Sequence, residues 1–163
     1  MNNTQNNLDL RSKISELTAQ TIPTKHKNSI EGLKNKFQHN ITLISNPNII
    51  DATGDCFLYV MKMVLGNDDY RKLKEAVQKT KNFTGLINNG FLSLHEGFNS
   101  GDRVVVYFDG GEVTHFGLID SGKVKSKWGS GLIWKHELYE VPITYGNIVQ
   151  FSDGLIDWNA LVK

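Results

Sequence analysis

Residues 103–128 read RVVVYFDGGEVTHFGLIDSGKVKSKW, and this stretch largely decides the fold. It contains three runs rich in β-branched and aromatic residues, 103–108, 112–119 and 123–128. The segments DGG and DSG separate the runs, and glycine-containing segments of this kind form tight hairpin turns. The sequence therefore predicts a three-stranded antiparallel meander over residues 103–128.

A buried helix is expected before the meander. Residues 56–65, CFLYVMKMVL, place apolar side chains on every side of a helical wheel, and Lys62 is the one charged residue among them. A helix that is apolar all round is normally enclosed by the rest of the protein. A buried strand is the alternative, but two methionines and ten residues without a helix breaker favour the helix.

The remaining segments complete an α+β arrangement. Residues 67–79 have the pattern of a surface helix, and residues 139–146 and 147–152 are expected to add one or two strands. Residues 1–40 carry two weaker amphipathic patterns, and we expect them to form a helical lead-in or arm. Helices followed by a meander predict an α+β fold, with residues 41–163 as its main domain.

Composition excludes several classes of function. The chain has 163 residues, 18 Lys and Arg against 17 Asp and Glu, and a formal net charge of +1. This balance gives no electrostatic reason to expect binding to nucleic acid or to an anionic membrane. No run of about 18 apolar residues indicates a membrane span, and the N-terminal MNNTQNNLDLRSK lacks the apolar core of a secretory signal. We therefore expect a protein that is cytoplasmic in the producing cell, or exported by an apparatus other than Sec.

The chain contains one cysteine, Cys56, which rules out an intramolecular disulfide and a multi-cysteine metal site. The five histidines show no ligand spacing such as H-x-x-x-H, so no metal or other cofactor is expected. Cys56 stands where the predicted buried helix should begin, and the candidate caps before it are Asp51, Thr53 and Asp55. The N–H groups and dipole of a helix N-terminus stabilise a thiolate, so Cys56 is a candidate nucleophile with a lowered pKa. The alternative is a buried structural thiol.

A cysteine nucleophile requires a base, usually a histidine that is close in space. His115 is the first candidate because it lies inside a predicted strand, EVTHFGLI, where a histidine is unusual unless its face meets something polar. Strand alternation places Val113, His115 and Gly117 on one face. His136 is the second candidate, and a structural role is the alternative for any strand histidine.

These residues resemble the papain-like cysteine hydrolases of the NlpC and CHAP type. The resemblance covers residues 53–129 and rests on the motifs Asp55-Cys56, Gly101-Asp102-Arg103-Val104 and His115-Phe116-Gly117-Leu118-Ile119. It implies a papain-like catalytic domain over residues 41–163, in which N-terminal helices, including the buried helix that carries the cysteine, pack on the antiparallel meander. The later pattern SKWG, H, VP and YG is similar to a bacterial subgroup with effector-like members.

The resemblance also implies roles for single residues. Cys56 is expected to be the nucleophile and His115 the general base, and the backbone N–H of Cys56 contributes to the oxyanion hole. The third catalytic residue aligns near Ser126, which shares a strand face with Trp128 and is expected to accept a hydrogen bond from the imidazole. Serine departs from the histidine, asparagine or aspartate that is usual there. Phe57-Leu58 likewise replaces the usual Ser-Gly after the cysteine.

Asp55, Trp128 and Tyr145 are the candidate substrate-binding residues. For Asp55 the alternative is a plain helix cap, and for the two aromatic residues it is a place in the core. Lys127 is given no role, because it is cationic and lies on the opposite strand face from Ser126.

Three functions are consistent with these residues. The first is hydrolysis of an amide bond in a peptidoglycan peptide by a papain-like cysteine peptidase or amidase, acting as a secreted antibacterial effector. The second keeps the chemistry and changes the substrate to a protein, with proteolysis, deamidation or acyl transfer as the reaction. The third is a papain-like binding module without catalysis. For the toxin functions, an immunity or inhibitor protein is an expected partner besides the substrate.

Overall fold

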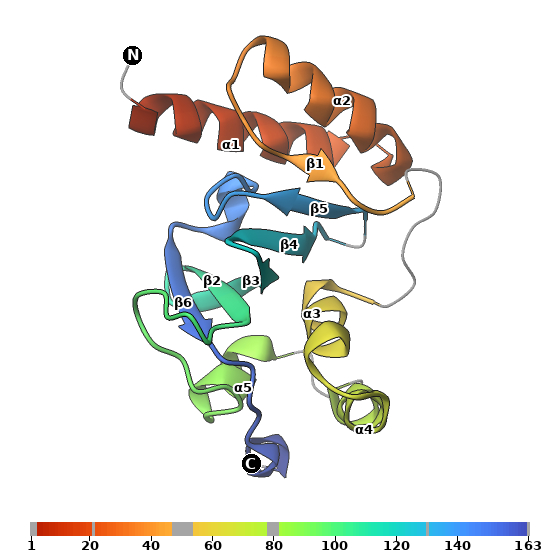
Figure 1. The fold of residues 1–163 in the computed structure, drawn as a ribbon, viewed down its shortest axis with the longest axis vertical. Helices are drawn as coiled ribbons and strands as arrows, with labels where there is room; N and C mark the ends of the chain where they lie inside the picture. The colour runs from red at the N-terminus through yellow and green to blue at the C-terminus, as the bar shows by residue number, and fades with distance from the viewer. Residues whose placement is uncertain (1–2, 21, 47–53, 78–81, 130, 163) are drawn as a thin grey trace.

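A six-stranded sheet forms the centre of the structure, a computed structural model that describes residues 3–20, 22–46, 54–77, 82–129 and 131–162. The strands follow the order β1-β5-β4-β3-β2-β6, and every pair of neighbours is antiparallel (Figure 1). The strands are β1 (Thr42–Leu43), β2 (Val104–Asp109), β3 (Glu112–Asp120), β4 (Lys123–Lys127), β5 (Ile133–His136) and β6 (Ile148–Ser152). The predicted meander is confirmed as β2, β3 and β4.

Both hairpins of the meander close through two residues with positive φ. Gly110 and Gly111 have φ of 57° and 88°, and Ser121 and Gly122 have φ of 53° and 76°. Two successive positive φ angles are typical of a type I′ turn, whose twist matches that of the strands it connects. The turn residues in DGG and DSG therefore help to fix the register of the meander.

Outside the meander, the strand predictions are confirmed only in part. β6 coincides with the predicted strand NIVQFS and pairs with β2. The prediction of a strand over residues 139–146 is wrong, because Pro142 precedes a 3-10 turn, η3 (Ile143–Tyr145), and Gly146 follows it with a φ of 84°. Proline cannot donate to a strand ladder, and a positive φ ends an extended segment. β1 and β5 are strands that no pattern in the sequence predicts.

Three helices pack on one face of the sheet: α3 (Cys56–Val64), α4 (Asn67–Val77) and α5 (Phe83–Asn88). An aromatic group joins α3 and α5 to β3, since the ring of Phe57 lies 4.8 Å from that of Phe83 and 5.0 Å from that of Phe116. Tilted and edge-on aromatic pairs at such distances add to the stability that their burial gives. The helix that carries the only cysteine is therefore fixed to the middle of the sheet.

The predicted helix over residues 56–65 is confirmed, but it is not enclosed on all sides. Val60 and Met61 are fully buried, whereas Met63 is 50% exposed and Lys62 also faces solvent. The helix lies on the sheet rather than inside the protein, so one of its sides faces outward. Exposed apolar residues on such a side are common and do not weaken the helix prediction.

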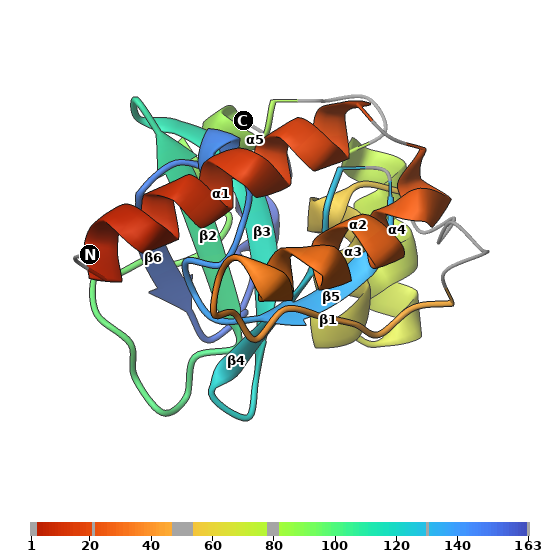
Figure 2. The same cartoon turned by 90° about the horizontal axis from the view of Figure 1, so that it is seen from above.

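The N-terminal helices α1 (Asn3–Gln20) and α2 (His26–Gly32) lie side by side across the sheet on its other face (Figures 1 and 2). Ile133 belongs to the core under α3, and the next residue of β5, Trp134, belongs to the core under α1 and α2. Successive strand residues point to opposite faces, so the two cores lie on opposite sides of the sheet. The second core consists of Leu10, Ile14, Ile30, Leu33, Phe37, Ile41, Trp128, Leu132 and Trp134.

A β-bulge at Thr114 changes which side chains of β3 share a face. His115 pairs with Tyr107 and Val113 pairs with Phe108, so Thr114 is an extra residue between the two pairs. A bulge of this kind breaks the regular alternation of side chains. Val113 consequently packs against the core under α3, whereas the ring of His115 lies 5.5 Å from that of Tyr107 on the other face. The prediction that Val113 and His115 share a face is wrong for this reason.

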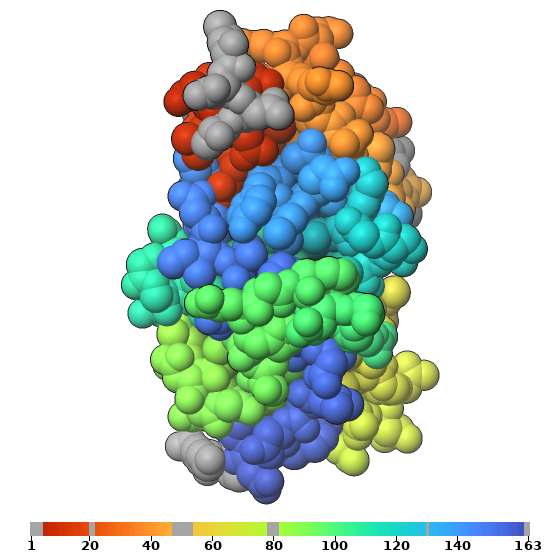
Figure 3. All heavy atoms as spheres, turned by 60° about the vertical axis from the view of Figure 1, so that its left-hand side comes forward, coloured from red at the N-terminus to blue at the C-terminus, as the bar shows by residue number. Residues whose placement is uncertain are grey.

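The segment between α5 and β2 covers part of the surface beside β6 (green in Figure 3). His95 forms an isolated antiparallel bridge with Phe151 of β6, and its Nε2 lies 3.0 Å from the carboxylate of Asp102. β6 is an edge strand, so this bridge covers backbone groups that would otherwise be open to another chain. None of the helices in the described ranges is long and apolar enough to span a membrane.

Candidate active site

The only thiol lies at the N-terminus of α3, as the sequence predicts. Asp55 is the N-cap, and its carboxylate accepts a hydrogen bond of 3.0 Å from the backbone N–H of Leu58. A capping carboxylate satisfies one of the free N–H groups of the first helical turn. Asp55 is therefore engaged as a helix cap, the alternative to its predicted role in substrate binding. The candidate caps Asp51 and Thr53 lie outside the described residues.

Burial controls the acidity of this thiol more than the helix terminus does. Cys56 as a whole residue is only half-buried, yet burial of the thiol raises its pKa to about 12. The backbone N–H of Phe116 lowers the pKa and the charge of Asp55 raises it, while the N–H groups at the helix terminus lower it. The terminus acts in the expected direction, but the loss of hydration of the thiolate outweighs it. The expectation of a lowered Cys56 pKa is therefore wrong for this state of the protein.

The contact with Phe116 arises where β3 and β4 separate. These strands pair only from Leu118 to Asp120 of β3, so Phe116 lies outside their ladder. Its backbone N–H lies close enough to the thiol of Cys56 to lower the pKa of that thiol, and Cys56 also packs against the core that contains the Phe116 ring. The thiol therefore lies at the edge of β3, beside the residue that follows His115.

His115 is a buried histidine with an unused ring nitrogen. It is 1% exposed, and its Nε2 makes no hydrogen bond. The imidazole is stacked on Tyr145 with ring centroids 3.9 Å apart and an angle of 12° between the planes. Burial holds the pKa of His115 well below its usual value, and a positive charge on His136 lowers it further. His115 is consequently neutral near pH 7 and keeps a free acceptor or donor site.

Tyr145 lies near both Cys56 and His115. Burial raises the pKa of Tyr145, and a thiolate at Cys56 raises it further through its charge. The phenol oxygen also accepts a hydrogen bond of 3.1 Å from the backbone N–H of Gly129. Tyr145 is therefore a shared neighbour of the predicted nucleophile and the predicted base, rather than the wall of an open groove.

Ser126 interacts with a different histidine from the one predicted. Its hydroxyl lies 2.7 Å from Nε2 of His136 and accepts a 3.1 Å hydrogen bond from the indole N–H of Trp128. Nδ1 of His136 lies 2.7 Å from the backbone oxygen of Glu137, which can only accept, so we assign the proton to Nδ1. Nε2 then accepts a hydrogen bond from the Ser126 hydroxyl. The predicted hydrogen bond between Ser126 and His115 is absent among the described contacts.

This network is fully buried, and its burial keeps His136 neutral. Both Ser126 and His136 are 0% exposed. Burial lowers the pKa of His136 to about 4, although its hydrogen bond to the Glu137 oxygen opposes that change. A chain of satisfied hydrogen bonds in a low-dielectric core favours one arrangement of its members. The network therefore fixes the β4–β5 face next to His115.

Trp128 and Lys127 lie on opposite faces of the end of β4, as alternation predicts. Trp128 is 3% exposed and stacks on Trp134 at a centroid distance of 5.1 Å, so it is a core residue here. Lys127 pairs with Ile133, which belongs to the core on the α3 side. Trp128 thus has the structural role that the sequence left as the alternative to substrate binding.

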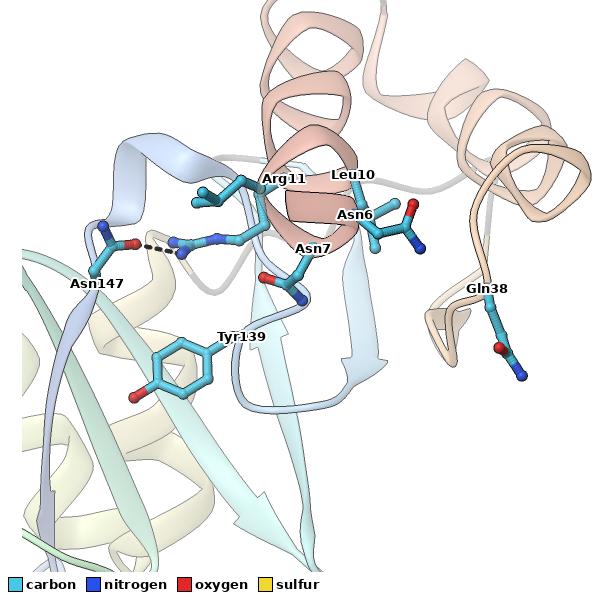
Figure 4. A pocket seen from close by; sticks show the side chains of 8 residues that line it. Asn6, Asn7, Leu10, Arg11, Gln38, Tyr139 and Asn147 are labelled. Atoms are coloured by element: carbon cyan, nitrogen blue, oxygen red, sulfur yellow. Dashed lines mark hydrogen bonds between the residues drawn. The ribbon is translucent and has the colours of Figure 1, made fainter. Parts of the chain in front are cut away.

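A cavity of about 680 Å³ lies away from the thiol, between α1, the segment before β1 and the segment that follows β5 (Figure 4). Amide, aliphatic and aromatic side chains line it, and neither Cys56 nor His115 belongs to it. The lining residues are Asn6, Asn7, Leu8, Leu10, Arg11, Gln38, Tyr139 and Asn147. Within the described ranges no group of three or more His, Cys, Asp or Glu residues could hold a metal ion.

Comparison with known proteins identifies the family. Residues 54–153 match a family described as a domain of unknown function, DUF7689, and this is well over half of the chain. The chain belongs to the DUF7689 family. No curated protein and no solved structure matched it. The DUF7689 region contains Cys56, His115, Ser126, His136 and Tyr145, whereas α1 and α2 precede it.

The acidity of Cys56 leads to a direct prediction for the native protein. Iodoacetamide reacts with thiolates, so a thiol whose pKa is near 12 should react about a thousandfold more slowly at neutral pH than a free cysteine. The rate should rise steeply as the pH becomes more alkaline. Mass spectrometry of samples quenched over time measures it, with urea-unfolded protein as the reference. Rapid labelling of the native protein near pH 6 would contradict the buried, protonated thiol.

Proposed function

We propose that this protein is a papain-like cysteine hydrolase that cleaves an amide bond, with Cys56 as nucleophile and His115 as general base. The observation that carries the proposal is the buried imidazole of His115, whose Nε2 has no partner. His115 directly precedes Phe116, whose backbone N–H lowers the pKa of the Cys56 thiol. A buried polar atom without a partner lowers stability, so such an atom requires an explanation. Proton exchange with the Cys56 thiol, which like His115 lies near Tyr145, is an explanation that uses both groups.

The proposed reaction needs only these two side chains and water. His115 takes the proton of the Cys56 thiol, and the thiolate attacks the carbonyl carbon of the amide. The backbone N–H of Cys56 stabilises the negative oxygen that forms. The imidazolium gives its proton to the leaving nitrogen as the C–N bond breaks, which leaves a thioester on Cys56. Water hydrolyses the thioester and restores the thiol.

In this proposal, a neutral Cys56 thiol and a neutral His115 imidazole form the resting state. Burial raises the pKa of the thiol and lowers that of His115, so both groups are uncharged in the protein without substrate. Thiolate and imidazolium would stabilise each other once they are brought into contact. Substrate binding is the step that we expect to bring them together. Ser126 has no direct part in this scheme, because its hydroxyl binds His136.

A peptide of bacterial peptidoglycan is the substrate that we propose, on the basis of the resemblance to NlpC and CHAP enzymes. The test is incubation of the full chain with purified peptidoglycan, followed by chromatography and mass spectrometry of the released fragments. We expect fragments with a new amino and a new carboxyl group, and none from a Cys56→Ala variant. Release of peptides or ammonia from proteins, with peptidoglycan left intact, would instead support the protein-directed alternative.

A non-catalytic papain-like module is the second candidate, and the acidity of the thiol favours it. A thiol with a pKa near 12 is a poor nucleophile unless its surroundings change. If this candidate is correct, no turnover is found on peptidoglycan or protein substrates, and Cys56→Ala leaves ligand binding unchanged.

A further inference from the structure

Arg11 of α1 forms hydrogen bonds with a loop that is distant from it in the sequence. Its side chain is 2% exposed and donates three hydrogen bonds. Nε binds the backbone oxygen of Val141 at 3.2 Å, and Nη2 binds that of Gly146 at 2.5 Å. Nη1 binds the side-chain oxygen of Asn147 at 2.5 Å, a contact that borders the cavity of Figure 4. All three acceptors belong to the loop 141–147 between β5 and β6.

The charge of Arg11 is not matched by an acid. Among the described residues no carboxylate forms an ion pair with its guanidinium, and burial lowers its pKa. Burying an unpaired cation is unfavourable unless its donors are well satisfied. The planar guanidinium can meet three acceptors on one loop at once, which the ammonium group of a lysine cannot do in the same geometry. Arg11 is therefore suited to fixing the shape of this loop.

The same loop carries the residue that contacts His115. Tyr145 stacks on the His115 ring, and its backbone oxygen lies 2.6 Å from the hydroxyl of Thr114 on β3. Gly146 lies against β2 so closely that an added Cβ would be 1.9 Å from the backbone oxygen of Phe108. The loop 141–147 thus packs closely against the sheet on one side and is hydrogen-bonded to Arg11 on the other. Few positions of the Tyr145 ring are compatible with both restraints.

We propose that Arg11 is a positioning residue for His115, which acts by holding the loop 141–147 and through it the ring of Tyr145. As far as catalysis is concerned, this proposal rests on the proposed function. The positioning itself does not, because it follows from the hydrogen bonds of Arg11 and the stacking of Tyr145 on His115. It also gives the N-terminal helix, which precedes the DUF7689 region, a role in the candidate active site of that region.

The test compares Arg11→Met with Arg103→Met in the full chain. Arg103 is the control: it is exposed rather than buried, but it also donates to two backbone oxygens, at 3.2 and 3.3 Å, at the far end of α3. The readout is an NMR titration of the His115 imidazole, whose surroundings include Tyr145, Tyr107 and His136. We expect Arg11→Met to raise the pKa of His115 by about one unit or more, because its ring gains access to water. Arg103→Met should leave that pKa unchanged.

A milder variant covers the case in which Arg11→Met does not fold. Asn147→Ala removes one of the three acceptors and keeps the arginine, so it should shift the His115 pKa in the same direction by a smaller amount. If the folded variants show the wild-type His115 titration, Arg11 has a structural role only and the proposal is overturned.

Turnover separates this proposal from the proposed function. On a substrate that the wild-type protein cleaves, Arg11→Met should lower kcat by about tenfold and leave KM nearly unchanged, since it disturbs the base and not the binding of substrate. A shift of the His115 pKa in a protein without any turnover would keep the positioning role and refute the enzyme. Turnover in the wild type, with an unchanged His115 pKa in both Arg11→Met and Asn147→Ala, would support the enzyme and refute the positioning role of Arg11.

Discussion

Alanine in place of Cys56 or His115 is expected to lower the rate of amide cleavage by roughly a thousandfold or more. Members of one catalytic unit fail together, so the double variant should be little worse than either single variant. Loss of the thiol removes the atom that forms the covalent bond. Loss of the imidazole leaves a thiol that remains protonated, because burial holds its pKa near 12. Initial rates of fragment release, measured at several substrate concentrations, give kcat and KM for each variant.

Ser126→Ala is the control for this experiment. Ser126 is as buried as His115, but it binds His136 and Trp128 instead of the proposed catalytic pair. Its replacement should lower stability, because the indole N–H of Trp128 loses its acceptor. It should lower kcat by about tenfold at most. Equal losses in Ser126→Ala and His115→Ala would show that the rates follow general damage to the core, and would refute the assignment of His115 as base.

The fold follows from local signals wherever they are strong. The turn residues DGG and DSG predict both hairpins, since each supplies two positive φ angles. Asp55 predicts the start of α3, because a capping carboxylate followed by an apolar run is a helix start. β5 is missed because a strand of four residues, Ile133–His136, is too short to show a period. Its place in the sheet depends on pairing with β4 and β1, which local sequence does not encode.

The sequence predicts where the single residues of the candidate site lie in the secondary structure, but not how they interact with one another. The position of Cys56 at a helix start and of His115 on a strand could be predicted from capping and alternation. The partner of Ser126 could not, because it depends on the register that sets Ser126 opposite Trp134 and close to His136. The sign of the Cys56 pKa shift depends on how much water reaches the thiol, which is a property of the packed fold.

Arg11 gives no signal in the sequence. It lies in a segment for which the sequence shows only a weak amphipathic pattern. Its acceptors are more than a hundred residues away in the sequence, so only tertiary packing brings them to Arg11. Two of these acceptors are backbone oxygens, which any residue type carries. The bulge at Thr114 is hidden in the same way, since it inserts one residue into a regular alternating run.

Acid is expected to destabilise the fold strongly, and His136 should account for about 3 kcal/mol of the loss. In the unfolded chain a histidine binds its proton near pH 6.5, whereas burial lowers the pKa of His136 in the fold to about 4. Between these values the unfolded chain binds more protons than the fold does. The free energy of unfolding therefore falls as the pH falls from about 6.5 to about 4. His115 acts in the same direction, because burial lowers its pKa as well.

The measurement is urea unfolding between about pH 7.5 and about pH 4.5, compared for the wild type, His136→Gln and His95→Gln. Glutamine at position 136 does not titrate and can still accept the Ser126 hydroxyl, so the variant should be less stable near neutral pH and lose less stability in acid. His95 is the control of opposite sign. Burial lowers its pKa, but hydrogen bonds to Asp102 and to backbone oxygens raise it overall, so His95 adds stability at low pH. Removing it should steepen the acid loss. An unchanged slope in His136→Gln would show that the buried network does not carry the acid sensitivity of this fold.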